Sequence, residues 1–148
     1  MRIATFTQTP ACPIIRDPRQ WLADNRPVVD RLLAFARSLP HAAGLAANQV
    51  EIDGVRLTHR FFAMNTGSVW LVCLNPRLDR IYGEHRTVEE TCLSWPGKTV
   101  VARRWTAIDA RYWDENGDEI LGLKLAGWPA QVFQHETDHL DGVTMSVA

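Results

Sequence analysis

The chain has 148 residues, 46% of them hydrophobic and 22% charged, and a formal net charge of −1. This length and composition predict one globular domain, which we expect to span residues 1–148. Without a run of lysines or arginines, neither a nucleic-acid groove nor an anionic membrane surface is expected as a partner. No apolar stretch approaches the ~20 residues of a membrane span, and the N-terminus lacks a signal-peptide pattern. Three widely spaced cysteines argue against a disulfide framework, so we expect a cytoplasmic protein.

The first part of the chain predicts one helix. Residues 1–26 contain three prolines and little periodicity, so we expect them to be mostly extended or irregular. Pro27 suits the first turn of a helix, and apolar residues in 28–39 recur on one side of that helix. An amphipathic helix is therefore predicted, ended by Pro40.

The middle of the chain changes to a β pattern. Two segments rich in β-branched and aromatic residues, 55–64 and 69–75, flank a predicted hairpin turn at 65–68. A polar stretch over 77–90 and a segment that ends in a turn, 91–97, come next.

Three further β-like segments follow, 98–105, 106–113 and 119–125, with a hairpin signal between the last two. The chain ends in a predicted helix with Pro129 in its first turn and Gly142 placed to stop it. This order predicts an α+β fold, in which antiparallel strands pack around a C-terminal helix and one helix lies near the N-terminus.

The C-terminal helix carries the pattern His-Glu-x-x-His. Residues four apart share a helix face, so His135 and His139 can bind one metal ion, with Glu136 beside it as a general base. The alternative is a solvated helix face that matches the pattern by chance. Apolar residues on the neighbouring stripe favour a packed helix and hence the metal site.

Two histidines need a third ligand. No glutamate follows Glu136, as a thermolysin-like site requires, and Met145 stands where a metzincin has its third histidine. The ligand must therefore come from upstream, where the candidates besides carboxylates are His41, His59, His85, Cys12, Cys73 and Cys92. We favour Cys92, because it lies at a strand end that runs into a turn, where active-site groups often sit.

Three stretches in this order are similar to the motifs of the peptide deformylase family: AAGLAANQ (42–49), ETCLSWPG (90–97) and QHETDHLDG (134–142). The resemblance extends from about residue 27 to residue 142. The third motif is complete, whereas Ala42 and Thr91 each replace a glycine of the family pattern. The chain also resembles the short family members of some bacteriophages, which lack a further C-terminal helix.

The resemblance implies a metal-dependent hydrolase that removes the N-formyl group from formyl-methionine at the start of nascent polypeptides, with the ribosome as a candidate place of action. It implies one divalent metal ion held by Cys92, His135 and His139. Iron(II) is expected, with zinc, nickel or cobalt as substitutes. Glu136 would be the general base, and the Gln49 side chain and the Leu93 backbone N–H would stabilise the oxyanion.

The resemblance also implies that a peptide substrate binds as an extra strand beside Gly44. The residues expected around its methionine are Ala43, Gly44, Leu45, Val88, Trp128 and Val132. Asp138 is expected to pair with Arg103 or Arg104 and so to orient the helix.

Two other functions stay open at this point. The glycine replacements are compatible with a catalytically impaired relative that serves as a binding protein. The His-Glu-x-x-His pattern alone would also suit a metallopeptidase, although the missing downstream ligand counts against that class.

Overall fold

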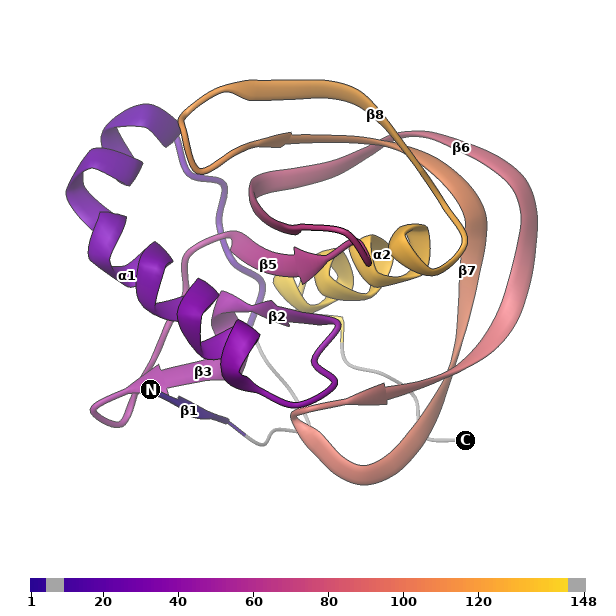
Figure 1. Ribbon diagram of the computed structural model, residues 1–148, viewed down its shortest axis with the longest axis horizontal. Helices are drawn as coiled ribbons and strands as arrows, with labels where there is room; N and C mark the ends of the chain where they lie inside the picture. The colour runs from indigo at the N-terminus through magenta and orange to yellow at the C-terminus, as the bar shows by residue number, and fades with distance from the viewer. Residues whose placement is uncertain (5–9, 144–148) are drawn as a thin grey trace.

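In the described part of the chain, two antiparallel sheets and two α-helices make up the fold (Figure 1). The computed structural model describes residues 1–4 and 10–143. The elements in chain order are β1 (Arg2–Ile3), α1 (Pro18–Ser38), β2 (Gly44–Ala46), the 3-10 turn η1 (Ala47–Gln49), β3 (Val50–Ile52), β4 (Val55–Arg56), β5 (Phe61–Asn65), β6 (Trp70–Cys92), β7 (Trp95–Trp113), β8 (Glu119–Ala126) and α2 (Trp128–Leu140). The predicted α+β fold is confirmed.

The main sheet separates the two helices. Its strand order is β2-β5-β6-β7-β8, and the smaller sheet has the order β1-β3-β4. Side chains alternate along β5, so Phe61 packs in the cluster that contains α1, and Phe62 packs in the cluster that contains α2. The rings of Phe62 and of Phe133 on α2 form a T-shaped contact, with 5.3 Å between centroids. Each helix therefore has its own apolar layer.

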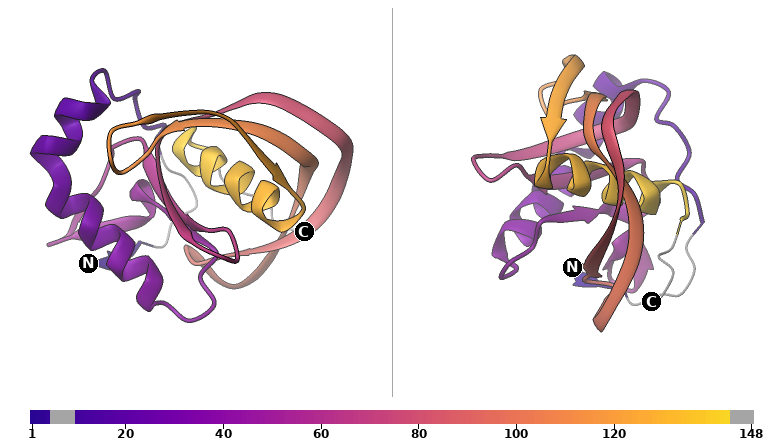
Figure 2. Two further views of the ribbon diagram at one scale, coloured as in Figure 1. Left: turned by 45° about the horizontal axis from the view of Figure 1, so that its top comes forward. Right: turned by 90° about the vertical axis from the view of Figure 1, so that its right-hand side faces the viewer.

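The long hairpin of β6 and β7 curves around α2 (Figure 2). Several register shifts interrupt the pairing of the two strands, including one between Tyr82 and His85. Such bulges bend a strand and increase its twist, which lets the hairpin wrap around the helix. Polar residues of α2 are enclosed as a result.

The N-terminal helix is longer than predicted. It begins at Pro18, where the Asp17 side chain caps the backbone N–H of Gln20 at 3.1 Å. Pro27 lies inside the helix, and the backbone departs from helical angles at Asn25. The prediction that residues 18–26 are irregular was wrong because the helix tolerates Pro27 by kinking just before it.

The strand boundaries also differ in part. The polar stretch 77–90 belongs to β6, the predicted strands 98–105 and 106–113 are one strand, β7, and the segment 55–64 divides into β4 and β5. Exposure and bulges remove the regular alternation that would have revealed β6. The hairpins at 65–68 and 114–118 and the C-terminal helix are confirmed. Neither helix in the described part of the chain is long and apolar enough to cross a membrane.

Candidate active site

The helix α2 buries polar side chains. His135, Glu136 and His139 are 8%, 3% and 1% exposed. Burying polar groups costs free energy unless each finds a partner. A short helix that buries these three side chains therefore needs partner groups from neighbouring segments. The segments that surround these side chains are the turn between β6 and β7 and the edge strand β2.

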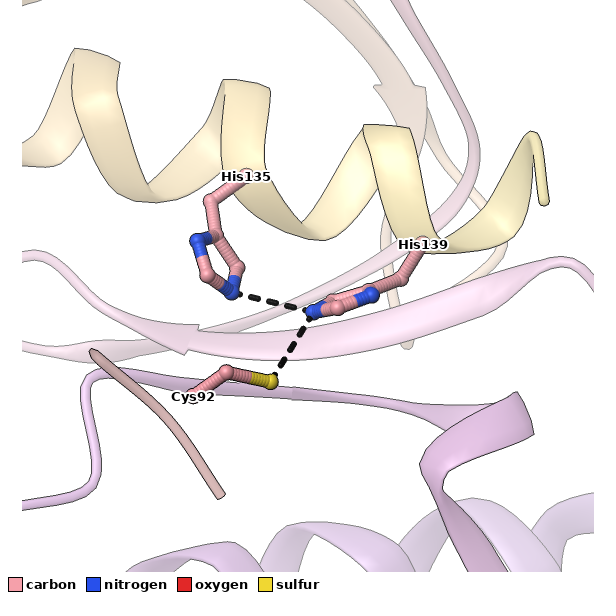
Figure 3. A group of neighbouring side chains, drawn as sticks. All are labelled: Cys92, His135 and His139. Atoms are coloured by element: carbon pink, nitrogen blue, oxygen red, sulfur yellow. Dashed lines mark hydrogen bonds between the residues drawn. The ribbon is translucent and has the colours of Figure 1, made fainter. Parts of the chain in front are cut away.

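Three side chains that could hold a metal ion meet beside α2 (Figure 3). The Nε2 atoms of His135 and His139 are 3.0 Å apart, and Nε2 of His139 is 3.4 Å from Sγ of Cys92. Cys92 ends β6 in a tight turn, where it pairs with Trp95. A thiolate and two imidazoles are a ligand set that leaves room for a further ligand on a four-coordinate metal. Met145, the position compared with metzincins, lies outside the described residues.

Glu136 points into the same cavity. Its Oε2 atom is buried and has no hydrogen-bond partner among the described residues. Burial is the largest cause that raises its pKa, to about 7, and the neighbouring Glu90 adds to this. Gly44 lies against this side chain so closely that a Cβ there would be 2.9 Å from Cγ of Glu136. The absence of a side chain at Gly44 therefore makes room for the carboxylate.

The Gln49 amide is oriented by the backbone. Its Oε1 atom accepts a hydrogen bond from the backbone N–H of Ala46 at 2.8 Å, so its NH₂ group points toward the site. That nitrogen is 3.2 Å from Oγ of Ser94 and 3.4 Å from Sγ of Cys92. Leu93 lies in the turn between Cys92 and Ser94 and lines the cavity. Both predicted oxyanion donors are thus next to Cys92, a candidate metal ligand.

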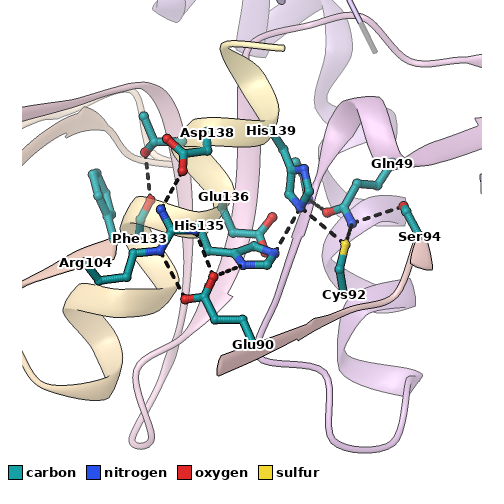
Figure 4. Close-up of polar contacts among 12 residues, drawn as sticks. Gln49, Glu90, Cys92, Ser94, Arg104, Phe133, His135, Glu136, Asp138 and His139 are labelled. Carbon is teal, nitrogen blue, oxygen red and sulfur yellow. Dashed lines mark hydrogen bonds and ion pairs between the residues drawn. The ribbon is translucent and has the colours of Figure 1, made fainter. Parts of the chain in front are cut away.

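A largely buried ionic network lies at the end of the site opposite Gln49 (Figure 4). Oε1 of Glu90 is 3.0 Å from Nδ1 of His135 and 2.8 Å from Nη2 of Arg104. Arg104 also forms an ion pair with Asp138, so one of the two predicted partners of Asp138 is found. Burial raises the pKa of Glu90, but hydrogen bonds from His135 and Arg104 outweigh it and lower that pKa to about 2. Glu90 is therefore a charged hydrogen-bond acceptor next to His135, a candidate metal ligand.

The two histidines differ in charge preference. Burial lowers the pKa of His135, but hydrogen bonds with Cys92 and Glu90 outweigh it and raise that pKa to about 10. Burial and the nearby charge of His135 lower the pKa of His139 to about 3. Metal binding requires both rings to be neutral at the coordinating nitrogen, so it would release a proton from this site.

A cavity of about 520 Å³ opens beside these residues. Four of the residues predicted to surround the substrate line it: Ala43, Gly44, Trp128 and Val132. Leu45 does not, because alternation along β2 turns it into the core on the α1 side. Val88 is not among the lining residues either, since it lies two residues before Glu90 on β6, about 7 Å further along the strand.

The two glycine replacements leave the local backbone in ordinary conformations. Neither Ala42 nor Thr91 has a positive φ, the region in which glycine would be required. Thr91 pairs with Thr99 in the β6–β7 ladder. Both residues line the cavity and leave the ligand group together, so the geometry gives no sign of a damaged site.

Some residues of the site were not predicted. Glu90 and Arg104 were not singled out as a pair, and Ser94 and Asn48 were not considered. A signal for Glu90 existed, because it lies two residues before Cys92 on a strand and so on the same face. No pattern within the sequence pairs Glu90 with Arg104, since that depends on the register of β6 and β7.

The comparison with known families agrees with this geometry. The family model for polypeptide deformylase matches residues 13–147. The chain belongs to this family. Family membership implies a catalytic metal, and Cys92, His135 and His139 are a group in the described part of the chain that could hold one. The resemblance found in the three motifs is thereby confirmed.

Individual deformylases are similar over different lengths. The chain is 41% identical over 100 residues to a peptide deformylase of Thermotoga neapolitana, an alignment that covers 68% of this chain and 57% of the relative. It is 31% identical over 134 residues to that of Desulforudis audaxviator, covering 88% and 84%. The first of these alignments thus spans little more than half of the relative.

Two solved structures are similar over nearly the whole chain. The peptide deformylase of Thermotoga maritima has a TM-score of 0.79 at 31% identity, with 96% of this chain and 92% of that chain covered. The deformylase of the Vibrio parahaemolyticus bacteriophage VP16T, solved in complex with actinonin, has a TM-score of 0.80 at 28% identity, with 97% and 99% covered.

Proposed function

We propose that this protein is a peptide deformylase, which hydrolyses the N-formyl group from the N-terminal formyl-methionine of nascent polypeptides. The observation that carries the proposal is the convergence of Gln49, Cys92, His135 and Glu136 at one cavity, with His139 packed against Cys92 and His135. That convergence supports an active enzyme over an impaired relative. The position of Cys92 supports deformylase chemistry over that of a metallopeptidase with a downstream ligand.

We propose Cys92, His135 and His139 as the ligands of one divalent metal ion. The donor set fits such an ion, and the buried Oε2 of Glu136 has no described partner, as expected beside a polar ligand. A bound metal would supply Lewis acidity and lower the pKa of a water molecule toward neutrality. Iron(II) is the proposed ion, and zinc, nickel or cobalt would be accepted by the same thiolate and imidazoles.

Glu136 is the proposed acid–base group. A pKa of about 7 lets its carboxylate accept a proton from the attacking water and return it to the leaving amine near neutral pH. Its carboxylate is held in place between α2 and Gly44. The side chain therefore needs little reorganisation to exchange a proton within the cavity.

Gln49 and Leu93 are the proposed donors to the oxyanion that forms when the formyl carbon is attacked. The Gln49 NH₂ group points to the side of the cavity where Cys92 lies, and Leu93 follows Cys92 directly. Losing one donor of this kind typically costs ~3 kcal/mol of transition-state stabilisation.

The open edge of β2 is the proposed peptide site. The Ala43 carbonyl accepts a hydrogen bond from Asn65, so alternation turns the N–H and C=O of Gly44 away from β5. An extended peptide can pair with that edge as an added strand. Trp128 and Val132 then lie where they can contact the methionine side chain.

The cellular setting follows from this substrate. Formylated nascent chains leave the ribosome in the bacterial-type cytoplasm, so we propose that residues 1–148 act there as one catalytic domain. No direct contact with nucleic acid or membrane is needed for that role. A bacteriophage origin stays a prediction.

A deformylation assay tests the proposal. The protein is purified without oxygen, loaded with iron(II) or cobalt(II), and given formyl-Met-Ala-Ser beside an unblocked peptide. We expect formate release from the first peptide and no cleavage of the second. Cleavage of peptide bonds without formate release would instead support a metallopeptidase. The absence of both formate release and peptide cleavage would support a binding protein.

A further inference from the structure

The last turn of α2 is held by side chains from outside the helix. A helix ends with carbonyls that have no partner within it, and its last turn frays unless these carbonyls are satisfied. Here that turn contains His139, a proposed metal ligand. We propose that Asn48 and Arg60 are positioning residues that set the place of the His139 imidazole by fixing the carbonyls of His139 and Leu140. This inference rests on the proposed metal site.

Asn48 acts on His139 itself. Its side-chain Nδ2 atom donates to the backbone carbonyl of His139 at 2.6 Å, and its side chain is buried, with the residue 1% exposed. Asn48 precedes Gln49 in η1, so one short turn contacts both the helix backbone and the cavity. A displacement of η1 would therefore move His139 and the Gln49 amide together.

Arg60 acts one residue further along. Its Nη1 atom donates to the carbonyl of Leu140 at 3.1 Å and to that of Cys12 at 3.3 Å, and its Nη2 atom pairs with Oδ1 of Asp141 at 2.6 Å. The Arg60 side chain is only 12% exposed. A cation at the C-terminus of a helix also interacts favourably with the helix dipole.

The segment before α1 completes this arrangement. The backbone N–H of Cys12 donates to the Leu140 carbonyl at 2.7 Å, so that carbonyl accepts from two sides. The His139 carbonyl likewise accepts from Asn48 and from the N–H of Gly142 at 3.0 Å. Removing Asn48 would therefore take one donor from the His139 carbonyl, and removing Arg60 one from the Leu140 carbonyl, while a backbone donor stays at each.

The expected consequence is a change in metal binding more than in folding. The three ligand atoms lie within 4.8 Å of one another, so a small rotation of the last turn would move His139 away from Cys92 and His135. Mutation of a residue that orients a metal ligand without binding the metal itself typically changes metal affinity by about 10–100-fold. Since Asn48 and Arg60 act through the backbone, we expect the lower end of that range.

The test uses cobalt(II) as the probe. Asn48→Ala and Arg60→Met are compared with Asn25→Ala and Arg111→Met. Asn25 also donates to a helix carbonyl, that of Trp21 at 2.9 Å, and Arg111 also pairs with an aspartate, Asp79 at 2.8 Å, but these partners lie outside α2. For each protein we measure the melting temperature without metal, the cobalt(II) affinity against a competing chelator, and the visible absorption of the cobalt(II) form.

Asn48→Ala and Arg60→Met are each expected to weaken cobalt(II) binding about tenfold and to alter the visible spectrum. The two controls should lower the melting temperature but leave affinity and spectrum unchanged. An unchanged affinity and spectrum in Asn48→Ala and Arg60→Met would overturn the inference. If either of these variants fails to fold, Asn48→Ser and Arg60→Lys are measured by the same criteria.

The outcome can be separated from that of the proposed function. A wild type that binds no cobalt(II) would refute the metal site and this inference together. A wild type that binds cobalt(II) with the same affinity as both variants would refute this inference alone. Deformylation of formyl-Met-Ala-Ser is measured separately and does not enter the comparison.

Discussion

Oε1 of Glu90 lies 3.0 Å from Nδ1 of His135, which joins the end of β6 to the middle of α2. If His135 binds a metal through Nε2, its Nδ1 atom carries the ring proton and donates a hydrogen bond to Glu90. Arg104 in turn keeps the Glu90 carboxylate charged. The orientation of a candidate metal ligand therefore depends on a strand residue that is two positions from Cys92.

Glu90→Gln is expected to weaken metal binding about 10–100-fold, because the neutral amide is a weaker acceptor for His135. It should also lower the free energy of unfolding by about 3 kcal/mol, since it leaves the buried Arg104 guanidinium without its main partner. Chelator competition and urea denaturation measure the two effects. Glu84→Gln is the control: it breaks the exposed pair with Arg86 and should cost less than about 1 kcal/mol. Equal metal affinity in wild type and Glu90→Gln would contradict the role assigned to Glu90.

The lowered pKa of Glu90 also predicts how the stability of the protein depends on pH. The pKa of Glu90 is about 2 in the folded protein and near 4.5 when unperturbed, so the unfolded chain binds more protons between these values. The stability that Glu90 contributes is complete above about pH 5 and is lost as the pH falls toward 2. Urea denaturation of the metal-free protein should therefore show a wild-type advantage over Glu90→Gln that shrinks on acidification. An advantage that is constant with pH would show that the Glu90 pKa is not lowered.

Gly44→Ala tests the contact between β2 and Glu136. The added Cβ would lie 2.9 Å from Cγ and 3.0 Å from Oε1 of Glu136, so the carboxylate must rotate away from its position. We expect kcat/KM for formyl-Met-Ala-Ser to fall by about 100-fold, as for a misplacement of about 1 Å, while the bound metal per chain stays unchanged. An unaltered kcat/KM would mean that the place of Glu136 is not set by Gly44.

Glycine substitutions at Ala42 and Thr91 test the two positions at which the chain departs from the family motifs. Ala42→Gly and Thr91→Gly should not raise kcat/KM, because neither residue has a backbone conformation that requires glycine. Each should lower stability by roughly 0.5–1 kcal/mol, since glycine loses more conformational freedom on folding. Steady-state kinetics and thermal unfolding of both variants check this. A large gain in activity from either change would support the view that the natural chain is impaired.

The sequence predicted the elements whose pattern is local. The helix α2, the hairpin at 65–68 and the turn at 114–118 follow from periodicity and turn residues that lie within a few positions of one another. The strand nature of 77–90 could not be seen, because this part of β6 is exposed and bulged and its fold depends on pairing with β7. The predicted start at Pro27 is too late, because the helix begins at Pro18 and passes Pro27 with a kink.

The residues of the candidate site that belong to sequence motifs could be predicted. Cys92, His135 and His139 were grouped from sequence, and the structure places them together. The pairing of Arg104 with Glu90, the contact of Asn48 with His139 and the inward turn of Leu45 were not accessible. These depend on strand register and on the packing of segments that are far apart in the chain, neither of which leaves a local pattern.

The most direct measurement is kcat/KM for deformylation of formyl-Met-Ala-Ser by the wild type and by Glu136→Gln, each loaded with cobalt(II) to the same content. Glutamine keeps the size of the side chain but cannot accept and return a proton. The acid–base role of Glu136 in a deformylase predicts formate release by the wild type and a fall of about 100- to 10,000-fold in Glu136→Gln, the usual contribution of a general acid–base group. Near wild-type activity in Glu136→Gln, or no formate release by metal-loaded wild type, would contradict it.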